Sequence, residues 1–480
     1  MLPSVTCLTG LVAIEKGLLP AVIINNGKRK VHCIEERMAF YNVPGVSIAV
    51  IENNEIAWCK SYGYADNERK VAVGRDTAFQ GGSISKPVTA WAILKLAEKH
   101  GLNLDENVNA YLKDWTVPEN DHTTHEKVTI RRLLNHSAGI NVAGVVGYKR
   151  QERLPTVLEI LNGAGGTPKI QVQSVPGTSF AYSGGGYVIL QKLVEDVAGA
   201  PFEVCMKNEL FDTLGMVSST FDQGDPSGGS GPPARSHAHD KEGRAYQGQY
   251  YAHSALGAAG LWSTPADLAN FCLAIHRAYG GKSGAYLSPA TAKDMLTANL
   301  GWGLGVGIRG EGENTFCFHA GKNAGFNSLM LYCFKKGIGI VIMTNGDQGA
   351  TLKDEIVRSF AAHYGLEIMP PRRIRTVRLG KDSLRGFAGK YQYEEFENYF
   401  LHVSIDKKNN LVLYDPNDGK INTFVPVKEN CFVDRYNGDE AVFTRNEEAG
   451  ENWRIFYNNA YTFTKVDAGN PTGSSPDGHA

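Results

Sequence analysis

The residues Ser83, Ile84, Ser85 and Lys86 form a Ser-x-x-Lys pattern that could support nucleophilic catalysis. Residues three apart lie on one face of a helix, so the lysine amine can approach the serine hydroxyl. A free serine hydroxyl is a poor nucleophile and needs a nearby base. A lysine can supply that base where burial holds its amine neutral. The pattern therefore indicates Ser83 as a candidate nucleophile and Lys86 as its proton-handling partner.

The Ser-x-x-Lys pattern is weak by itself, because about two matches are expected by chance in a chain of this length. A second match runs from Ser404 to Lys407, in a β-rich segment where a strand would not bring the two side chains to one face. The context favours Ser83, which follows a glycine pair and precedes an amphipathic helix opened by Pro87. The alternative is that Ser83 only caps this helix while Lys86 is solvated.

Two further motifs lie downstream of Ser83. Residues 176–188 read PGTSFAYSGGGYV and place Tyr182 in a turn before a helix-like run. Residues 318–328 read FHAGKNAGFNS and place His319 near the end of a strand-like segment. A tyrosine whose pKa is lowered by a nearby cation is a plausible base, which makes Tyr182 a second candidate for proton transfer.

With these three motifs in this order, the chain resembles the serine β-lactamase and penicillin-binding-protein superfamily. The resemblance is closest to the class C-like branch of esterases and D-aminopeptidases, and it extends over roughly residues 30–370. It implies an α/β (α+β) fold in which an antiparallel sheet is flanked by helices and joined to an all-helical subdomain. The tail resembles the lipocalin-like antiparallel β-barrel that follows this domain in some members.

The resemblance implies a role for each motif residue. Ser83 would attack the substrate carbonyl, and Lys86 and Tyr182 would share the proton. The backbone N–H groups of Ser83 and Lys322 would form the oxyanion hole, and His319 would line the site. No metal and no organic cofactor is implied. The remaining positions that the family pattern brings to the substrate are Gly184, Gly321 and Asn323.

Two departures from the family pattern bear on the substrate. The tyrosine motif is commonly Tyr-x-Asn, whereas Gly184 stands at the asparagine position here. The third motif begins with His319, where β-lactamases usually carry a lysine, so a permanent cation is absent at that position at neutral pH. Both changes weigh against efficient β-lactam hydrolysis. We therefore expect a carboxylesterase that acts on small acyl esters through an acyl-enzyme.

Three other functions remain open at this point. The chain could be a D-stereospecific aminopeptidase or peptidase, which the missing asparagine places second. It could transfer its acyl group to an acceptor other than water, since acyltransferases keep the same motifs. It could also be an inactive ligand sensor, although the intact serine, lysine and tyrosine argue against this.

The composition favours a small-molecule substrate. The 480 residues include 49 Lys and Arg against 50 Asp and Glu, a balance that suggests neither nucleic acid nor an anionic membrane as partner. The eight cysteines are scattered without a Cys-x-x-Cys pair, which argues against a zinc site and a disulfide scaffold. His237, His239 and His253 could line a channel, but no paired ligand set accompanies them.

The sequence contains no run of 18 apolar residues, so it predicts no membrane-spanning helix. The first residues lack the pattern of a secretory signal, so we expect a cytoplasmic protein. The oligomeric state is left open.

The sequence also indicates how the chain is divided into parts. The Gly- and Pro-rich stretch 225–233 predicts a surface excursion. The expected parts are an N-terminal extension (1–30), the hydrolase domain (31–370), a linker (371–382), the barrel (383–468) and a disordered tail (469–480).

Overall fold

The computed structural model of the chain divides into two compact units. The first comprises Met1–Glu15 and Cys33–Phe360, and the second comprises Lys16–His32 and Ala361–Ala480. The stretch 225–233 and the tail 469–480, for which we predicted an excursion and disorder, lie outside the described residues. The structure describes residues 5–25, 31–224, 234–395, 398–416, 420–445 and 453–466.

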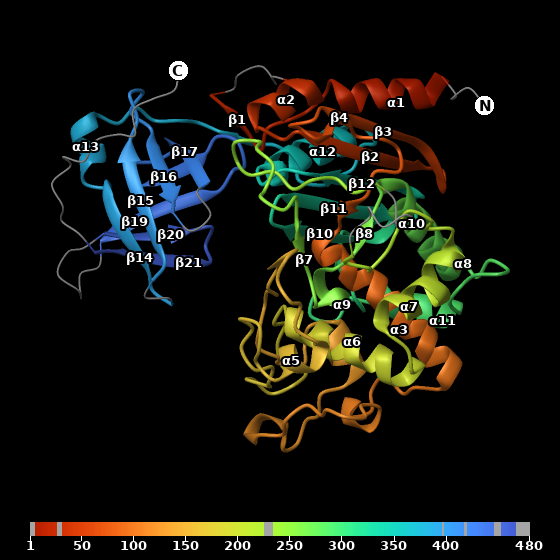
Figure 1. Ribbon diagram of the computed structural model, residues 1–480. Coiled ribbons are helices and arrows are strands. Elements are labelled where there is room, and N and C mark those ends of the chain that lie inside the picture. Colours follow the sequence, from red (N-terminus) through yellow and green to blue (C-terminus); the bar gives the residue numbers. More distant parts are fainter. Residues whose placement is uncertain are drawn as a thin grey trace. The chain divides into compact units, whose positions relative to one another are not determined.

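A seven-stranded antiparallel sheet forms the centre of the first unit (Figure 1). All but the last residue of its strand β2 are buried, so both faces of the sheet are covered. The strands in spatial order are β4 (Val71–Ala72), β3 (Glu55–Asp66), β2 (Gly45–Glu52), β12 (Ile338–Thr344), β11 (Phe326–Cys333), β10 (Phe316–Asn323) and β9 (Gly307–Arg309).

Helices surround this sheet and also form a separate helical layer (Figure 1). Helix α10 packs on β2, β3 and β12, while α3, α6 and α9 pack on one another. The main helices are α1 (Val5–Glu15), α2 (Ile34–Phe40), α3 (Ser85–His100), α4 (Ile130–Leu134), α5 (Val157–Leu161), α6 (Gly184–Ala198), α7 (Phe202–Met206), α8 (Asp212–Leu214), α9 (Leu256–Ala259), α10 (Pro265–Tyr279), α11 (Pro289–Met295) and α12 (Gly349–His363).

The ends of the predicted helices follow from their local sequence. Gly101 ends α3 in the left-handed conformation, with φ of 67°, and its N–H donates to the carbonyl of Ala97. Thr264 caps α10 by accepting a hydrogen bond from the backbone N–H of Asp267 at 3.2 Å. Inside the helical layer, Trp91 of α3 is fully buried and stacks on Tyr286 with ring centroids 6.0 Å apart. The predicted sheet-and-helix architecture is therefore confirmed.

The second unit contains a closed barrel of eight antiparallel strands, as predicted. Its first strand pairs with its last, so the sheet has no free edge. Leu384 of helix α13 (Lys381–Arg385) is buried in the barrel core. The strands are β14 (Gly389–Tyr393), β15 (Phe400–Ile405), β16 (Leu411–Asp415), β17 (Lys420–Pro426), β18 (Cys431–Asp434), β19 (Glu440–Arg445), β20 (Trp453–Tyr457) and β21 (Tyr461–Lys465).

The second unit also includes a segment from near the beginning of the chain. Strand β1 (Val22–Ile24) pairs in parallel with β13 (Arg372–Ile374), and Val22 is buried against Val433. The residues that we expected as one N-terminal extension are thus divided between the two units. The reason is that the apolar run at 21–24 buries its side chains and satisfies its backbone on partners distant in sequence, which local patterns do not reveal.

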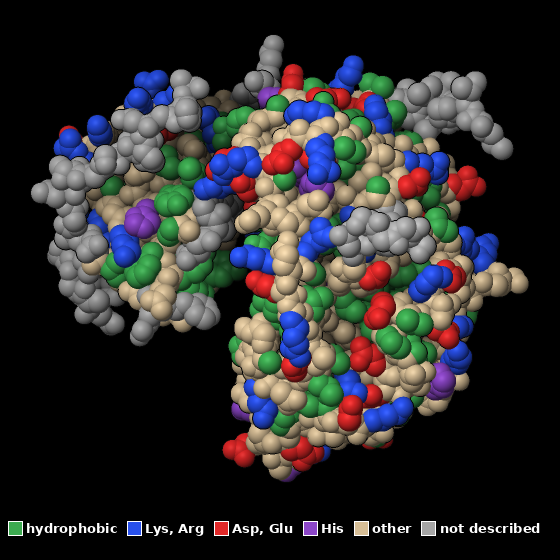
Figure 2. Space-filling view, viewed as in Figure 1, with side chains coloured by type: hydrophobic (Ala, Val, Ile, Leu, Met, Phe, Trp, Pro, Cys, Tyr) green, Lys and Arg blue, Asp and Glu red, His purple; other side chains and the backbone are tan. Residues whose placement is uncertain are grey.

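The visible face of the first unit carries Lys and Arg side chains interspersed with Asp and Glu side chains (Figure 2). No single-sign patch dominates this face, in keeping with the net charge of -1. Minor strands complete the first unit: β5 (Phe79–Gln80) pairs with β8 (Trp262–Ser263), and β6 (Tyr148–Lys149) pairs with β7 (Tyr251–Ala252). Among the described residues, no helix is long and apolar enough to cross a membrane.

Candidate active site

Ser83 lies in a short 3₁₀ turn, Gly82–Ile84, that leads directly into α3. Ser85 fixes this turn, because its hydroxyl donates to the carbonyl of Gly82 at 2.6 Å and accepts from the N–H of Leu261 at 3.0 Å. The amine of Lys86, in the first turn of α3, donates to the Ser83 hydroxyl at 3.1 Å. The Ser-x-x-Lys spacing therefore brings the hydroxyl and the amine into direct contact.

Lys86 is almost completely buried, with 2% of its surface exposed. Its amine also donates to the carbonyl of Ala258 in α9 at 2.8 Å, and it lies 5.0 Å from the centroid of the Tyr182 ring. Burial lowers the pKa of Lys86 to about 7. A large fraction of this amine is consequently neutral near pH 7, which is the state that a base requires.

Tyr182 lies two residues before helix α6, and its side chain forms a hydrogen bond with that of Ser83. Ser183 caps that helix by accepting a hydrogen bond from the N–H of Gly186 at 3.0 Å, which fixes the turn that carries the tyrosine. Burial raises the pKa of Tyr182 to about 12, although a hydrogen bond with the Ser83 side chain acts in the opposite direction. The phenol is therefore protonated at neutral pH and can donate a proton.

His319 lies on β10 and faces the same cluster. Its ring centroid is 6.2 Å from that of Tyr182 and 5.6 Å from that of Trp302. Burial and the nearby Lys86 amine lower the pKa of His319 to about 3, although the contact of its ring with the carbonyl of Ala320 acts in the opposite direction. The imidazole is thus neutral at pH 7, and His319 brings no positive charge to the site.

Glycines allow β10 to approach the Ser83 turn. A Cβ on Gly321 would stand 1.9 Å from the carbonyl oxygen of Gly81, and a Cβ on Gly82 would stand 2.7 Å from the backbone nitrogen of Lys322. Both distances are too short for a side chain, so only glycine permits this approach. The backbone of Lys322 consequently lies beside the turn that holds Ser83, where an oxyanion hole would be needed.

Asn323 has a structural task in the folded protein. Its amide nitrogen donates to the Gln80 side chain at 2.7 Å and to the carbonyl of Ala259 at 3.1 Å. These bonds join β10 to β5 and α9, so its N–H donors are not available to a substrate. Beside Asn323 lies a cavity of about 320 Å³, lined by Val145, Gly147, Tyr251, His253, Lys322, Asn323 and Ala324.

Gly184 is a packing position at the start of α6. Its N–H donates to the carbonyl of Ala143 at 3.0 Å. A Cβ at this position would stand 2.9 Å from a methyl of Val145 and 3.0 Å from the Ala143 carbonyl. The loop around residues 143–145 therefore fills the space in which the family's asparagine side chain would begin.

His136 supports the turn that carries Tyr182. His136 has a positive φ of 60°, and its Nδ1 accepts a hydrogen bond from the N–H of Ser183 at 3.1 Å. Its ring lies 4.3 Å from that of Tyr182, centroid to centroid. Burial lowers the pKa of His136 well below its ordinary value, so it is a neutral support for the tyrosine turn.

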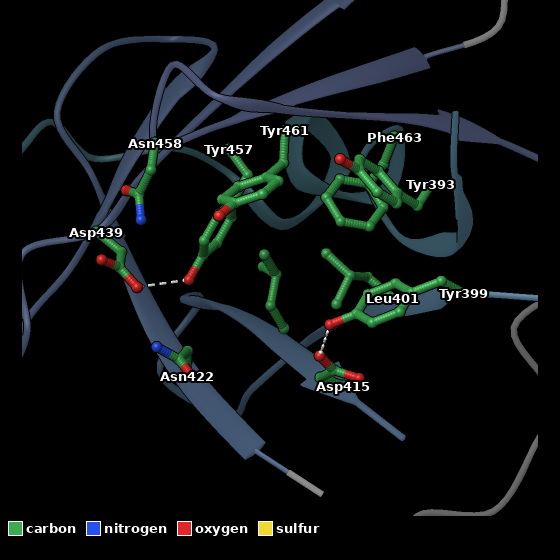
Figure 3. Close-up of a pocket in the computed structure, with 11 residues that line it drawn as sticks. Tyr393, Tyr399, Leu401, Asp415, Asn422, Asp439, Tyr457, Asn458, Tyr461 and Phe463 are labelled. Carbon is green, nitrogen blue, oxygen red and sulfur yellow. Dashed lines mark hydrogen bonds between the residues drawn. The ribbon is translucent and has the colours of Figure 1, made fainter. Parts of the chain in front are cut away.

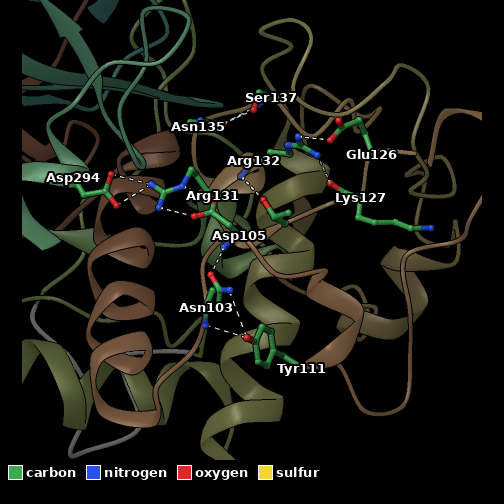
Figure 4. A network of polar contacts seen from close by, with 11 residues as sticks. Asn103, Asp105, Tyr111, Glu126, Lys127, Arg131, Arg132, Asn135, Ser137 and Asp294 are labelled. Carbon is green, nitrogen blue, oxygen red and sulfur yellow. Dashed lines mark hydrogen bonds and ion pairs between the residues drawn. The ribbon is translucent and has the colours of Figure 1, made fainter. Parts of the chain in front are cut away.

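A polar network holds the segment that carries His136 (Figure 4). Arg131 in α4 donates to Asp105 at 2.7 Å and to Asp294 at 2.8 Å. After the helix, the hydroxyl of Ser137 donates to the side chain of Asn135 at 2.7 Å. The segment 133–140, which reads LLNHSAGI, supports Tyr182 through contacts between segments distant in sequence, which local patterns do not reveal. Trp302, which contacts the same rings, had no sequence signal.

The other described histidines do not form a metal centre. His239 contacts the carbonyl of Asn345 through Nδ1 at 2.8 Å, and burial lowers the pKa of His253 to about 4. Within the described parts of the chain, no group of three or more His, Cys, Asp or Glu side chains could hold a metal ion. The seven cysteines at described side-chain positions are free thiols.

The chain is similar to several known proteins. A family model described as Beta-lactamase matches residues 31–362. Protein flp of Staphylococcus aureus (strain N315) is 25% identical over 356 residues, covering 72% of this chain and 67% of the relative.

Two solved structures share the fold. The octameric penicillin-binding protein homologue from Pyrococcus abyssi is 24% identical, with a TM-score of 0.58, and covers 90% of this chain and 98% of its own. The D-amino acid amidase from Ochrobactrum anthropi SV3 is 20% identical, with a TM-score of 0.55, and covers 69% of this chain and 97% of its own.

Proposed function

Since the chain belongs to the beta-lactamase family of serine hydrolases, we propose that it is a carboxylesterase that hydrolyses small acyl esters through an acyl-enzyme on Ser83. The observation that carries this proposal is the contact of the Ser83 hydroxyl with the amine of Lys86 at 3.1 Å. The pKa of that amine, lowered by burial to about 7, suits it to accept the hydroxyl proton.

In the acylation step, neutral Lys86 takes the proton of Ser83 while the serine oxygen forms a bond to the ester carbonyl carbon. The backbone N–H groups of Ser83 and Lys322 stabilise the oxyanion. The carbon–oxygen bond to the leaving alcohol then breaks, and the phenol of Tyr182 protonates the departing oxygen. Proton transfer from Lys86 to Tyr182 restores both groups. A water molecule then attacks the acyl carbon while neutral Lys86 takes one of its protons, and Lys86 returns that proton to the Ser83 oxygen as the serine ester bond breaks and the acid is released.

Two features of the site support an ester rather than an aminopeptidase substrate. The loop around Val145 leaves no room for a side-chain amide at Gly184 to hold a peptide carbonyl. The described lining of the 320 Å³ cavity includes Lys322 and no carboxylate, so the free ammonium of an aminopeptidase substrate would lack a counter-ion there.

A second candidate is hydrolysis of D-amino acid amides. Its support is the D-amino acid amidase fold, which covers 69% of this chain. Turnover of p-nitrophenyl butyrate should be compared with turnover of the p-nitroanilides of D-alanine and L-alanine. A higher kcat/KM for the D-alanine anilide than for the ester would favour the second candidate.

The decisive experiment compares Ser83→Ala with Ser404→Ala. Ser404 begins the second Ser-x-x-Lys match and lies exposed on barrel strand β15, where its change should leave the ester rate unaltered. We expect Ser83→Ala to lose about 10⁴-fold or more in kcat. Intact-mass analysis after a serine-directed phosphonate should show one adduct on the wild type and none on Ser83→Ala. An active, unlabelled wild type would refute the proposal.

A further inference from the structure

The cavity of about 320 Å³ beside Asn323 adjoins the turn that holds Ser83. The side chain of Gln80 donates to the carbonyl of Tyr251 at 2.7 Å, and the backbone of Lys322 lies beside Gly82. Tyr251 and Lys322 both line the cavity. Its volume lies within the range of about 300–1,000 Å³ that small-molecule sites occupy. The cavity is therefore placed to receive part of a substrate held at Ser83.

His253 lines this cavity and supplies an unsatisfied polar group. The residue is 4% exposed, and neither nitrogen of its ring forms a hydrogen bond with the described residues. The nearby carbonyl of Val146 could engage only one of the two nitrogens. At least one buried nitrogen is therefore left without a partner, which is unfavourable unless a bound molecule satisfies it.

The pairing of β6 with β7 fixes the position of this ring. Tyr148 pairs with Ala252, so Gly147 and His253 follow as neighbours at the ends of the two strands. A Cβ on Gly147 would stand 3.0 Å from Cε1 and 3.5 Å from Nε2 of His253. The edge of the ring that carries Nε2 consequently lies against Gly147, which is itself a lining residue of the cavity.

A larger cavity, of about 490 Å³, lies within the barrel of the second unit and differs in this respect. There the hydroxyl of Tyr399 donates to Asp415, and the hydroxyl of Tyr457 donates to Asp439 at 2.6 Å (Figure 3). No described residue of that lining has a buried side-chain nitrogen or oxygen that lacks a hydrogen-bond partner. The cavity at His253 is thus the one that points to a ligand.

The charge of the lining at His253 favours an anion. Lys322 is exposed at the cavity, and its ammonium forms no ion pair or hydrogen bond with the described residues. The described lining includes neither Asp nor Glu. Burial lowers the pKa of His253 to about 4, so its imidazole is neutral at pH 7 and carries one N–H donor. An N–H donor beside an ammonium on a flexible stem suits a carboxylate.

The position of the cavity along β10 relates it to the acyl group. His319 comes before Lys322 on this strand, whereas the lining continues beyond Lys322 with Asn323 and Ala324. Tyr182, the proposed proton donor to the leaving alcohol, lies near His319. Because each strand residue advances about 3.3 Å, the cavity lies away from the leaving-group end of the site and faces the acyl end.

Given the proposed esterase function, on which this inference rests, we propose that the cavity at His253 binds a carboxylate at the far end of the acyl group. The preferred substrates are then monoesters of short dicarboxylic acids. A ring N–H of His253 donates to the carboxylate, and the ammonium of Lys322 lies over it. His253 is thereby a specificity-determining residue that takes no part in proton transfer at Ser83.

The first test compares two ethyl esters that differ only at the end of the acyl group. Monoethyl glutarate ends in a carboxylate, and ethyl 5-methylhexanoate ends in a neutral isopropyl group of similar shape. Acid release in a pH-stat at neutral pH should give a kcat/KM about tenfold or more higher for the glutarate, because hydrogen bonds to charged groups are strong. An equal or higher kcat/KM for the neutral ester would overturn the inference and leave the proposed esterase standing.

Variants test the two groups through the ratio of kcat/KM for the two esters, which a general loss of activity does not change. His253→Phe keeps a ring and removes both nitrogens, and it should lower the ratio about tenfold. Lys322→Met removes the ammonium and keeps the backbone N–H, and it should lower the ratio about threefold. Lys335→Met, in the exposed turn between β11 and β12, should leave the ratio unaltered. An unaltered ratio in His253→Phe would overturn the inference.

Binding to the Ser83→Ala protein provides a test that does not depend on turnover. Calorimetric titration of this variant should show monoethyl glutarate binding about tenfold tighter than ethyl 5-methylhexanoate, and adding His253→Phe should remove the difference. If the wild type hydrolyses neither ester, the proposed function fails and this titration alone decides whether the cavity binds a carboxylate. Equal binding of the two esters would overturn the inference.

Discussion

Two buried lysines in the first unit differ in what surrounds them. Lys86 in α3 is 2% exposed and Lys192 in α6 is 4% exposed. Lys192 forms ion pairs with Asp114 and Asp196. Burial lowers the pKa of Lys192, but its hydrogen bonds to these two aspartates outweigh burial and the pKa is raised. Lys86 contacts a hydroxyl and a carbonyl instead, and burial lowers its pKa to about 7.

The difference shows that the partner, rather than burial alone, decides what a buried lysine can do. The carboxylate of Asp196 lies four residues after Lys192 on one helix face, whereas Ala90 holds the equivalent position after Lys86. A lysine held charged by carboxylates stabilises structure, and a lysine without them can release its proton near neutral pH.

The largest effect is expected for Lys86→Met. The variant should lose about 10⁴-fold in kcat/KM for p-nitrophenyl butyrate, because the phenol of Tyr182, which also contacts the Ser83 side chain, is protonated at neutral pH and cannot replace the amine as base. Its melting temperature should equal or exceed that of the wild type, since an apolar side chain replaces an amine at a buried position. A rate within tenfold of the wild type would remove Lys86 from the mechanism.

The matched change Lys192→Met should act on stability instead. Removing the cation leaves the buried carboxylate of Asp196 uncompensated, so the free energy of unfolding should fall by about 3 kcal/mol. Urea unfolding followed by fluorescence measures this loss. The ester rate per folded molecule should stay within threefold of the wild type at 20 °C, and a collapse of that rate would contradict the division of roles between the two lysines.

The pH profile gives the next effect in size. Because the Lys86 base must be neutral, kcat/KM should fall about tenfold per pH unit below its pKa of about 7 and level off above it. The folded pKa lies below the ordinary value of 10.5, so the unfolded chain binds the extra proton between these values. This group therefore makes stability rise with pH across that window. A flat rate from pH 5.5 to 8.5 would exclude Lys86 as the base.

The smallest effect is expected for Asp114→Asn. This carboxylate is 58% exposed, so water and salt screen its attraction for Lys192. The melting temperature should fall by no more than about 2 °C. Differential scanning calorimetry of this variant beside Lys192→Met would separate the exposed partner from the buried one, and equal losses in the two would contradict that distinction.

Features set by neighbours in sequence were predictable. The contact of Ser83 with Lys86 follows from three-residue spacing at a helix start, and the barrel strands follow from short apolar runs between turns. The presence of Tyr182 and His319 beside them was expected from a resemblance, since nothing local brings residues so distant together.

Features that depend on close approach of distant segments were not predictable. The packing of the loop at Val145 against Gly184 could not be seen in the sequence. The same holds for the hydrogen bonds that the amide of Asn323 donates to Gln80 and Ala259. The support that His136 gives to the tyrosine turn also requires knowing that Ser183 lies within hydrogen-bond distance.

The pairing of β1 with β13 has a consequence for synthesis of the chain. The partners of Val22–Ile24 are Arg372–Ile374, so roughly 350 residues leave the ribosome before this pairing can form. At about 5–20 residues per second, the early strand waits on the order of 20–70 s for its partner. During that interval an apolar, unpaired edge is exposed to other nascent chains, and chaperones that bind such edges would protect it.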